Sequence, residues 1–182
     1  MRIIGGKYGR RIIKTPKNLP VRPTTDLAKE SLFNILNNKI DFLGKTVLDL
    51  FSGTGAISYE FISRNCEEVT SVEMNPNCYK FIKETSEKFG MEKHRIVRSE
   101  VFKFLKSHKK SYDIIFADPP YAMPNFLELV DLIFNNNLLK ENGLLIVEHP
   151  IEVDFSNKKY FFEKRKYSKV NFSLFMYTTE NQ

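Results

Sequence analysis

An acid, two prolines and a tyrosine end an apolar segment of the sequence, where they could act on a bound amine. Residues 114–121 read IIFADPPY. Pro119 and Pro120 have no backbone N–H and a fixed φ, so a strand cannot continue through them and the Pro119 carbonyl is left free. A carboxylate on Asp118 and this carbonyl form a paired acceptor for an –NH₂ group. Tyr121 can lay its ring against a planar base.

Methylation of an exocyclic amine needs such a pair of acceptors. The lone pair of a purine amine is delocalised into the ring, which makes the amine a poor nucleophile. Two acceptors on its hydrogens draw the nitrogen towards tetrahedral geometry and localise the lone pair. Asp118 then acts by orientation and charge stabilisation more than by prior deprotonation. Taken alone, the segment favours a plain strand end with Tyr121 in the core, so the upstream motifs decide.

A glycine turn upstream indicates where the transferred group would bind. Residues 49–58, DLFSGTGAIS, pass from an apolar strand through a turn into a helix. Backbone N–H groups and the positive end of the helix face a ligand at such a turn. Glu73 closes the next strand, twenty residues after Gly53, where a carboxylate can accept from both ribose hydroxyls.

Two classes of ligand suit this turn. The dinucleotide fingerprint has glycine or alanine at its third position, which is Ser58 here, and Asp49 would repel a pyrophosphate. S-adenosylmethionine carries an ammonium, a sulfonium and only one carboxylate, so acids beside the turn favour its binding. A tight turn without a ligand is the structural alternative, and the position of Glu73 counts against it. The sequence therefore favours the methyl donor.

The elements that must position these residues alternate between strands and helices from Lys45 onwards. Strands are expected at residues 46–51, 69–73, 95–100, 113–118 and 143–149, and helices at residues 56–63, 76–89, 101–107 and 124–137. The aromatic segment 160–180 fits two antiparallel edge strands better than a helix. This alternation predicts an α/β fold with an open, mostly parallel sheet and helices on both faces.

The first 43 residues are expected to form an extension, and residues 44–182 the main domain. Residues 2–14 predict a β-hairpin or arm, and three prolines follow before Thr24. Thr24 or Thr25 then caps a helix to about Asn37, with Leu27 among its apolar residues.

Composition excludes several classes of protein. The chain has 182 residues with 42% hydrophobic and 27% charged side chains, which predicts one globular domain. No apolar run reaches the ~18 residues of a membrane span, and the N-terminus has no signal-peptide core, so a cytoplasmic protein is expected. Cys66 and Cys78 form no motif. The three histidines are unclustered, so no metal site is expected. Glu148 and His149 end the fifth expected strand near the expected ligand site, and a surface role is favoured over catalysis for both.

Basic residues are concentrated in three segments. Residues 1–22 hold seven Lys and Arg and no acid. Residues 93–110 hold seven against one acid, and residues 158–169 hold six against one. Such runs are often solvated faces, but an acid-free arm favours a polyanionic partner, with nucleic acid preferred to a membrane.

The motifs together resemble a known enzyme family. Residues 49–56, 72–75 and 116–121 (DLFSGTGA, VEMN and FADPPY) resemble class I S-adenosylmethionine-dependent methyltransferases that act on exocyclic amines. Residues 2–11 and 22–36 resemble the RsmD-like family, bacterial methyltransferases of guanine N2 in small-subunit (16S) ribosomal RNA. The resemblance implies a Rossmann-like, seven-stranded, mostly parallel sheet with an antiparallel last strand. It implies small-subunit RNA as the partner, presented in a 30S subunit or assembly particle.

The resemblance also implies roles for individual residues. The catalytic loop would be Asp118, Pro119, Pro120 and Tyr121. Donor-binding residues would be Asp49, Phe51, Ser52, Gly53, Thr54, Gly55, Glu73, Met74, Glu100 and Val101, with Glu100 replacing the family's usual aspartate. RNA-facing residues would be Arg10, Arg11, Arg22, Thr24 and Lys29. For Lys29, an ordinary first helical turn with an i,i+3 partner is an equally good interpretation.

Three alternatives remain open. An adenine-N6 or protein-glutamine methyltransferase shares the same loop design, although such relatives more often carry added recognition domains. A non-catalytic RNA-binding assembly factor could keep the fold alone, but it would have no need of Asp118 or Glu73. A nicotinamide oxidoreductase is disfavoured by Ser58. No metal or membrane partner is expected, and a monomer is favoured.

Overall fold

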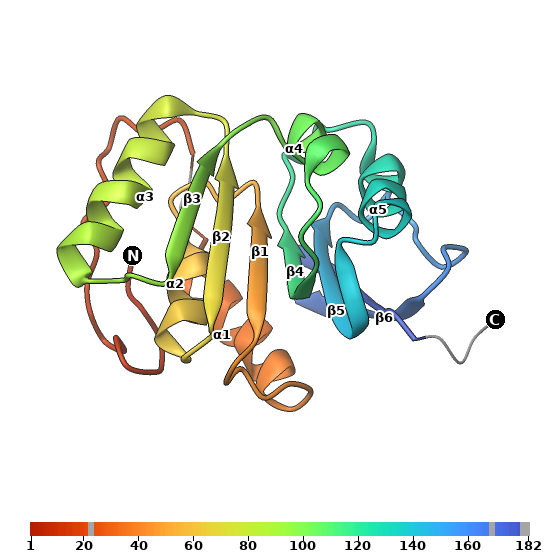
Figure 1. Ribbon diagram of the computed structural model, residues 1–182, viewed down its shortest axis with the longest axis horizontal. Helices are drawn as coiled ribbons and strands as arrows, with labels where there is room; N and C mark the ends of the chain where they lie inside the picture. The colour runs from red at the N-terminus through yellow and green to blue at the C-terminus, as the bar shows by residue number, and fades with distance from the viewer. Residues whose placement is uncertain (22–23, 168–169, 179–182) are drawn as a thin grey trace.

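The computed structural model describes residues 1–21, 24–167 and 170–178 of the chain. Seven strands form one sheet in the order β3-β2-β1-β4-β5-β7-β6 (Figure 1). The strands are β1 (Thr46–Leu50), β2 (Glu68–Glu73), β3 (His94–Arg98), β4 (Tyr112–Ala117), β5 (Leu139–His149), β6 (Phe161–Tyr167) and β7 (Val170–Met176). The helices are α1 (Asp26–Asn37), α2 (Ala56–Ser63), α3 (Pro76–Phe89), α4 (Val101–Ser107) and α5 (Phe126–Asn135). The predicted α/β architecture is confirmed.

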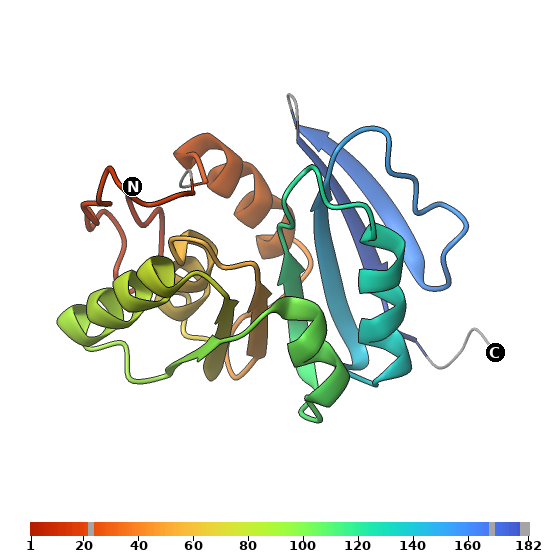
Figure 2. The same cartoon turned by 90° about the horizontal axis from the view of Figure 1, so that it is seen from above.

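The central strands bury both faces of the sheet, as near-continuous apolar runs predict. In β4, Ile114 and Phe116 face the core under α1, α2 and α3, while Ile115 and Ala117 face the core under α4 and α5. Figure 2 shows these two groups of helices on opposite sides of the sheet. Burial on both sides fixes the register of β4, because a shift by one residue would exchange its two faces.

The parallel strands end together at one edge of the sheet. β1 pairs in parallel with β2 and with β4, and β4 pairs in parallel with β5. Asp49, Glu73, Asp118 and Glu148 all lie at or beside the carboxyl ends of these strands. The fold therefore gathers four acids at the edge where open α/β sheets bind their ligands.

The two C-terminal strands, β6 and β7, are antiparallel as predicted, but their places in the sheet differ from the prediction. β7 is antiparallel to both β5 and β6, which confirms the reversed last strand. However, β7 is inserted between β5 and β6, so only β6 lies at the edge, and the expectation of two edge strands was wrong. None of the helices in the described residues is long and apolar enough to cross a membrane.

The N-terminal arm is less regular than a β-hairpin. An isolated antiparallel bridge between Arg2 and Ile12 is the pairing found in residues 1–14, with turns between them. Ile3, Tyr8 and Ile13 are buried in the same core as α1, α2 and the sheet. Residues 2–14 are therefore better described as an arm than as a β-hairpin. The boundary at residue 43 stays a prediction, since residues on both sides of it share one core.

Helix α1 begins as predicted. Thr25 is its N-cap, and the Thr25 side chain accepts a hydrogen bond from the Ala28 N–H at 3.2 Å. Leu32, Phe33 and Leu36 are buried against the core. Leu27 does not belong to this face: it is 71% exposed, so its assignment to the apolar face was wrong.

A buried cluster of charges fastens α1 to α2 and to the arm. The Lys29 ammonium lies 3.3 Å from Glu60 Oε1 and also donates to the Arg2 carbonyl. Glu60 Oε1 accepts from the Ile4 N–H at 2.7 Å, and Glu60 Oε2 lies 2.5 Å from Arg64 Nη1. Lys29 is only 1% exposed, so it cannot reach an RNA phosphate in this structure, and its prediction as an RNA contact is corrected. Its i,i+3 pairing with Asp26 at 3.3 Å fits the alternative interpretation.

Candidate active site

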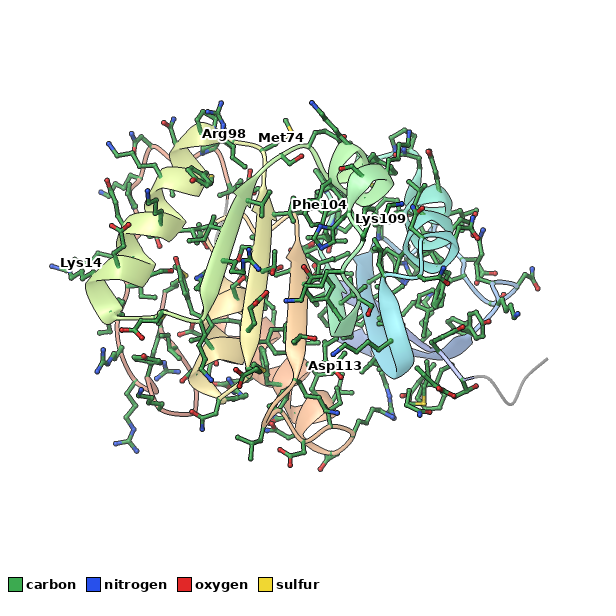
Figure 3. The ribbon with its side chains drawn as sticks, viewed as in Figure 1. Lys14, Met74, Arg98, Phe104, Lys109 and Asp113 are labelled. Atoms are coloured by element: carbon green, nitrogen blue, oxygen red, sulfur yellow. The ribbon has the colours of Figure 1, made fainter. Side chains whose placement is uncertain are left out.

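A cavity of about 720 Å³ lies at the carboxyl edge of the sheet, where the acids gather. Met74 and Arg98 lie at this edge and Asp113 at the opposite one (Figure 3). Five carboxyl side chains border the cavity, and among the described lining residues there is no lysine or arginine: the acids are Asp49, Glu73, Glu100, Asp118 and Glu148. A pocket of this charge favours a cationic ligand and repels a pyrophosphate.

The turn after β1 places main-chain groups along the cavity. Phe51, Ser52, Gly53 and Thr54 line it, as predicted. Phe51 has a φ of 62° and Gly53 a φ of 55°, so two left-handed residues tighten this turn. Left-handed backbone at a non-glycine residue is uncommon and is concentrated at functional sites.

Gly55 supports the turn from behind and is not among the residues that line the cavity. Its φ is 77°, and a Cβ there would come within 2.9 Å of the Tyr59 ring and 3.2 Å of Ile82. Glycine is therefore needed here, because the Tyr59 ring and Ile82 pack closely against this position. The predicted contact between Gly55 and the donor stays a prediction.

Glu73 braces the turn as well as bordering the cavity. Its Oε2 accepts from the Gly53 N–H at 2.8 Å, and its Oε1 accepts from the Asn75 N–H at 2.7 Å. Glu73 is 7% exposed. The carboxylate thus fixes the geometry between the ends of β1 and β2, and the predicted contact with ribose hydroxyls would use the remaining lone pairs of the same oxygens.

Asp49 is buried at the floor of the cavity. Ser58 donates a hydrogen bond to its carboxylate, and Ser58 Oγ lies 2.5 Å from Ser71 Oγ. Burial raises the pKa of Asp49 to about 7, and the charge of Glu73 adds to this rise. Ser58, which breaks the dinucleotide pattern, therefore has a structural role, because its hydroxyl holds the Asp49 carboxylate in place.

We expect Asp49 to lower the stability of the ligand-free protein as the pH rises. Its carboxyl group ionises from its ordinary pKa of 3.8 in the unfolded chain, but only at about 7 in the folded protein. The folded state binds more protons between these values, so the free energy of unfolding falls with increasing pH across that window. Between pH 4 and pH 8, the free energy of unfolding should therefore fall by less in Asp49→Asn than in the wild type. The difference should be at least about 1.4 kcal/mol, the equivalent of one pKa unit.

Urea unfolding of the two proteins at both pH values measures this difference. Asp154→Asn is a matched control, because Asp154 is exposed and its pKa is lowered by the backbone N–H and hydroxyl of Ser156. Equal pH dependence in Asp49→Asn and the wild type would contradict the argument.

Three further predicted residues border the cavity on the side of β2 and β3. Met74 is 66% exposed at the cavity, and Val101 is buried there. Glu100 also lines the cavity, but its carboxylate caps α4 by accepting from the N–H groups of Phe102 at 2.9 Å and Lys103 at 2.7 Å. In this structure the Glu100 side chain therefore serves as the N-cap of α4.

The Asp118 loop lies across the cavity from Glu73, and all four predicted catalytic residues line the cavity. Among the described residues, neither the Asp118 carboxylate nor the Pro119 carbonyl has a hydrogen-bonding partner. Burial, Glu148 and Asp49 hold the pKa of Asp118 well above its ordinary value. Tyr121 is 50% exposed. The loop thus presents two unused acceptors beside an accessible aromatic ring.

Glu148 lines the cavity, as its expected place near the ligand site suggested. It is 7% exposed, and its Oε1 accepts a hydrogen bond from the Tyr121 hydroxyl at 3.2 Å. His149 is fully buried, with Nε2 2.8 Å from Ser173 Oγ. The expected surface role was therefore wrong for both residues.

The arm closes one side of the cavity. Five residues from the end of the arm to the first turn of α1 line the cavity: Pro20, Val21, Thr24, Thr25 and Ala28. Of the predicted RNA contacts within the described residues, Thr24 alone lines the cavity. Arg22 lies outside the described residues.

The remaining arginines of the arm lie away from the cavity. The Arg11 guanidinium lies over the rings of Tyr8 at 4.9 Å and Phe89 at 5.3 Å. Phe89 ends α3, and α3 returns the chain from the carboxyl edge towards the start of β3. Arg10 is exposed, with a φ of 67°. Roles for these two in RNA binding stay predictions. Within the described residues, no group of three or more His, Cys, Asp or Glu side chains is placed to hold a metal ion.

The strand order, the reversed β7 and the cavity at the carboxyl edge define the class: this is the fold of the class I methyltransferases. The family can also be named. Residues 1–178 match the profile of the family described as conserved hypothetical protein 95, and the chain belongs to that family. It is 32% identical over 180 residues to ribosomal RNA small subunit methyltransferase D of Buchnera aphidicola, covering 97% of this chain and 91% of that one. The Escherichia coli K12 protein of the same name is 32% identical and covers 84% of this chain and 76% of its own.

Solved structures agree with this assignment. The Escherichia coli protein yhhF superposes with a TM-score of 0.85 at 28% identity, covering 98% of both chains. A hypothetical protein of Thermus thermophilus superposes with a TM-score of 0.83 at 28% identity, covering 96% of this chain and 98% of that one. The arm and the C-terminal strands are therefore shared with these relatives.

Proposed function

We propose that the chain transfers a methyl group from S-adenosylmethionine to N2 of a guanine in small-subunit ribosomal RNA. The observation that carries this proposal is the unpartnered acceptor pair of Asp118 and Pro119, facing a cavity whose other side is the Gly53 turn braced by Glu73. Relatives along nearly the whole chain are named as methyltransferases of small-subunit ribosomal RNA, which supports the class of reaction.

The chemistry of the cavity fits the proposed donor. An ammonium and a sulfonium are cations, and five carboxyl groups without a lysine or arginine among the described lining residues favour them. Glu73 would hold the ribose hydroxyls, the Gly53 turn would face the amino acid portion, and Met74 with Val101 would offer apolar contact to the adenine. When bound, S-adenosylmethionine supplies an electrophilic methyl group: its carbon–sulfur bond breaks with the electron pair left on sulfur as the amine lone pair forms the carbon–nitrogen bond.

The loop after β4 would prepare the amine. Asp118 and the Pro119 carbonyl accept from its two hydrogens, which turns the lone pair out of the ring plane. The two prolines keep both acceptors in place, so little order has to be gained when the base binds. The methylated amine carries a positive charge, which the Asp118 carboxylate stabilises before the amine loses one proton to it or to water. Tyr121 would stack on the base.

RNA binding would rest on the basic arm and on the wall beside it. Arg22 directly follows the lining residue Val21 in the sequence and is the arginine nearest to a lining residue along the chain. Arg10 and Arg11 would bind phosphates farther from the target base. A substrate that contacts both the cavity and these two arginines must span the distance between them, as an RNA within a 30S subunit or assembly particle would. We propose that the protein acts on it as a monomer.

The test of the proposal is to map methyl groups on ribosomal RNA. Small-subunit RNA from cells with and without this protein would be digested and compared by mass spectrometry. We expect one guanine to carry an N2-methyl group only when the protein is present. The purified protein with labelled donor and subunits from the deficient cells should restore the same nucleotide. A methylated adenine or protein glutamine instead, or no methyl difference, would overturn the proposal.

A further inference from the structure

Glu148 stands beside the proposed amine site with unused hydrogen-bonding capacity. The register that pairs Ala117 with Val147 places Asp118 and Glu148 as neighbours at the ends of β4 and β5. Both line the same cavity, and burial together with the negative charge of Glu148 raises the pKa of Asp118. Among the described residues, Oε2 of Glu148 has no partner, while Oε1 accepts from the Tyr121 hydroxyl.

The Tyr121 hydroxyl donates to one oxygen of Glu148, Oε1. Burial, with the charges of Glu148 and Asp118 added to it, raises the pKa of Tyr121 to about 12, so its hydroxyl retains the proton that it donates. Burial raises the pKa of Glu148, and this hydrogen bond opposes the rise, because a donor favours the ionised form of a carboxyl group. In its ionised form, Glu148 can accept a hydrogen bond at Oε2 from a donor in the cavity.

The candidate substrates differ in the group next to their amine. In guanine, N2 is next to N1–H, which is a donor. In adenine, N6 lies between N1 and N7, which are both acceptors, and the amine of a glutamine side chain is next to its own carbonyl, also an acceptor. Only guanine among these three presents a donor beside the amine.

We propose that Glu148 selects guanine by accepting a hydrogen bond from N1–H while Asp118 and the Pro119 carbonyl hold the 2-amine. This rests on the proposed function, because it assigns the base at the same site. Adenine or glutamine in the same place would direct an acceptor at the Glu148 carboxylate, and both groups would lose their hydrogen bonds to water without replacement. Glu148 is thus a specificity residue that touches the base.

The experiment compares two bases at the target nucleotide. One RNA carries guanine at the mapped position and the other carries 2-aminopurine, which keeps the 2-amine but has an unprotonated N1. The wild type should prefer guanine strongly. In Glu148→Gln the amide can donate to the bare N1, so the ratio of kcat/KM for guanine to that for 2-aminopurine should fall at least about tenfold. Comparing the ratio between enzymes cancels the effect of the missing O6.

Tyr121→Phe tests the hydrogen bond that positions Glu148. It removes the hydroxyl but keeps the ring and the Glu148 carboxyl group, so the ratio should fall in the same direction as in Glu148→Gln but by less. Calorimetry of S-adenosylmethionine and thermal unfolding check that Glu148→Gln retains donor binding and fold. An unchanged ratio in Glu148→Gln would overturn the inference, while methylation of guanine by the wild type would still uphold the proposed function. If the wild type methylates no guanine, both fail.

Discussion

Replacing Asp118 by alanine is expected to lower the rate of methyl transfer about 10²- to 10³-fold, the cost of losing one preorganised group that stabilises transition-state charge. Donor binding should change little, because the donor turn is braced by Glu73 and not by Asp118. The Asp118 carboxylate has no hydrogen-bonding partner among the described residues, so its loss breaks no contact of the fold. Since Glu148 and Asp49 repel it, the variant should be at least as stable as the wild type.

Single-turnover transfer of a labelled methyl group, with calorimetry of donor binding, separates these effects. Asp118→Asn is the matched control: it keeps one acceptor oxygen and the side-chain shape but loses the charge. We expect it to lie between the wild type and Asp118→Ala. Because the pKa of Asp118 is raised, the wild-type rate should increase with pH as this carboxyl group ionises, and that increase should be absent in Asp118→Asn. Undiminished turnover in Asp118→Ala would mean that the loop only ends a strand.

The donor side of the site was predictable because its signals are local in the sequence. A glycine turn at a strand end, and an acid at the end of the next parallel strand, are brought together by the βαβ topology itself. The same rule places Glu148 near the site as well. Its role there was not predicted, because β5 ends in Glu148-His149-Pro150 and no motif marks this stretch. The hydrogen bond that positions its carboxylate comes from Tyr121, 27 residues away.

The arm was harder to predict because its role depends on contacts between distant residues. A basic, acid-free segment predicts binding to a polyanion, but it does not reveal that Val21 and Thr24 form a wall of the cavity. Lys29 illustrates the ambiguity most clearly. Its i,i+3 partner Asp26 is visible in the sequence, whereas Glu60, 31 residues away, is not. Only the packing of α1 against α2 shows that this lysine is structural.

Neutralising Glu60 is expected to destabilise the fold strongly. Glu60 is fully buried and accepts from Lys29, Arg64 and the Ile4 N–H, so Glu60→Gln removes the counter-charge of Arg64 and leaves Lys29 with the half-exposed Asp26 alone. Removing one partner of a buried ion pair costs about 3–5 kcal/mol, so we expect a loss of about 3 kcal/mol and a midpoint of thermal unfolding lower by roughly 6–12 °C. The exposed pair Lys80–Glu84 has the same i,i+4 spacing as Glu60–Arg64, and Glu84→Gln should change stability by less than about 0.5 kcal/mol.

The buried charge cluster around Glu60 also holds the start of the N-terminal arm, so its loss should affect donor binding. Lys29 and Glu60 hold the Arg2 carbonyl and the Ile4 N–H, so weakening them should release the start of the arm. The arm leads to Val21 at the cavity, and six of its seven Lys and Arg residues are sites for trypsin, since Arg22 is followed by Pro23. Brief digestion at a temperature where both proteins are folded should therefore cut the arm faster in Glu60→Gln than in Glu84→Gln, with weaker donor binding as a result. Equal cleavage in the two variants would show that the charge cluster stabilises α2 without fastening the arm.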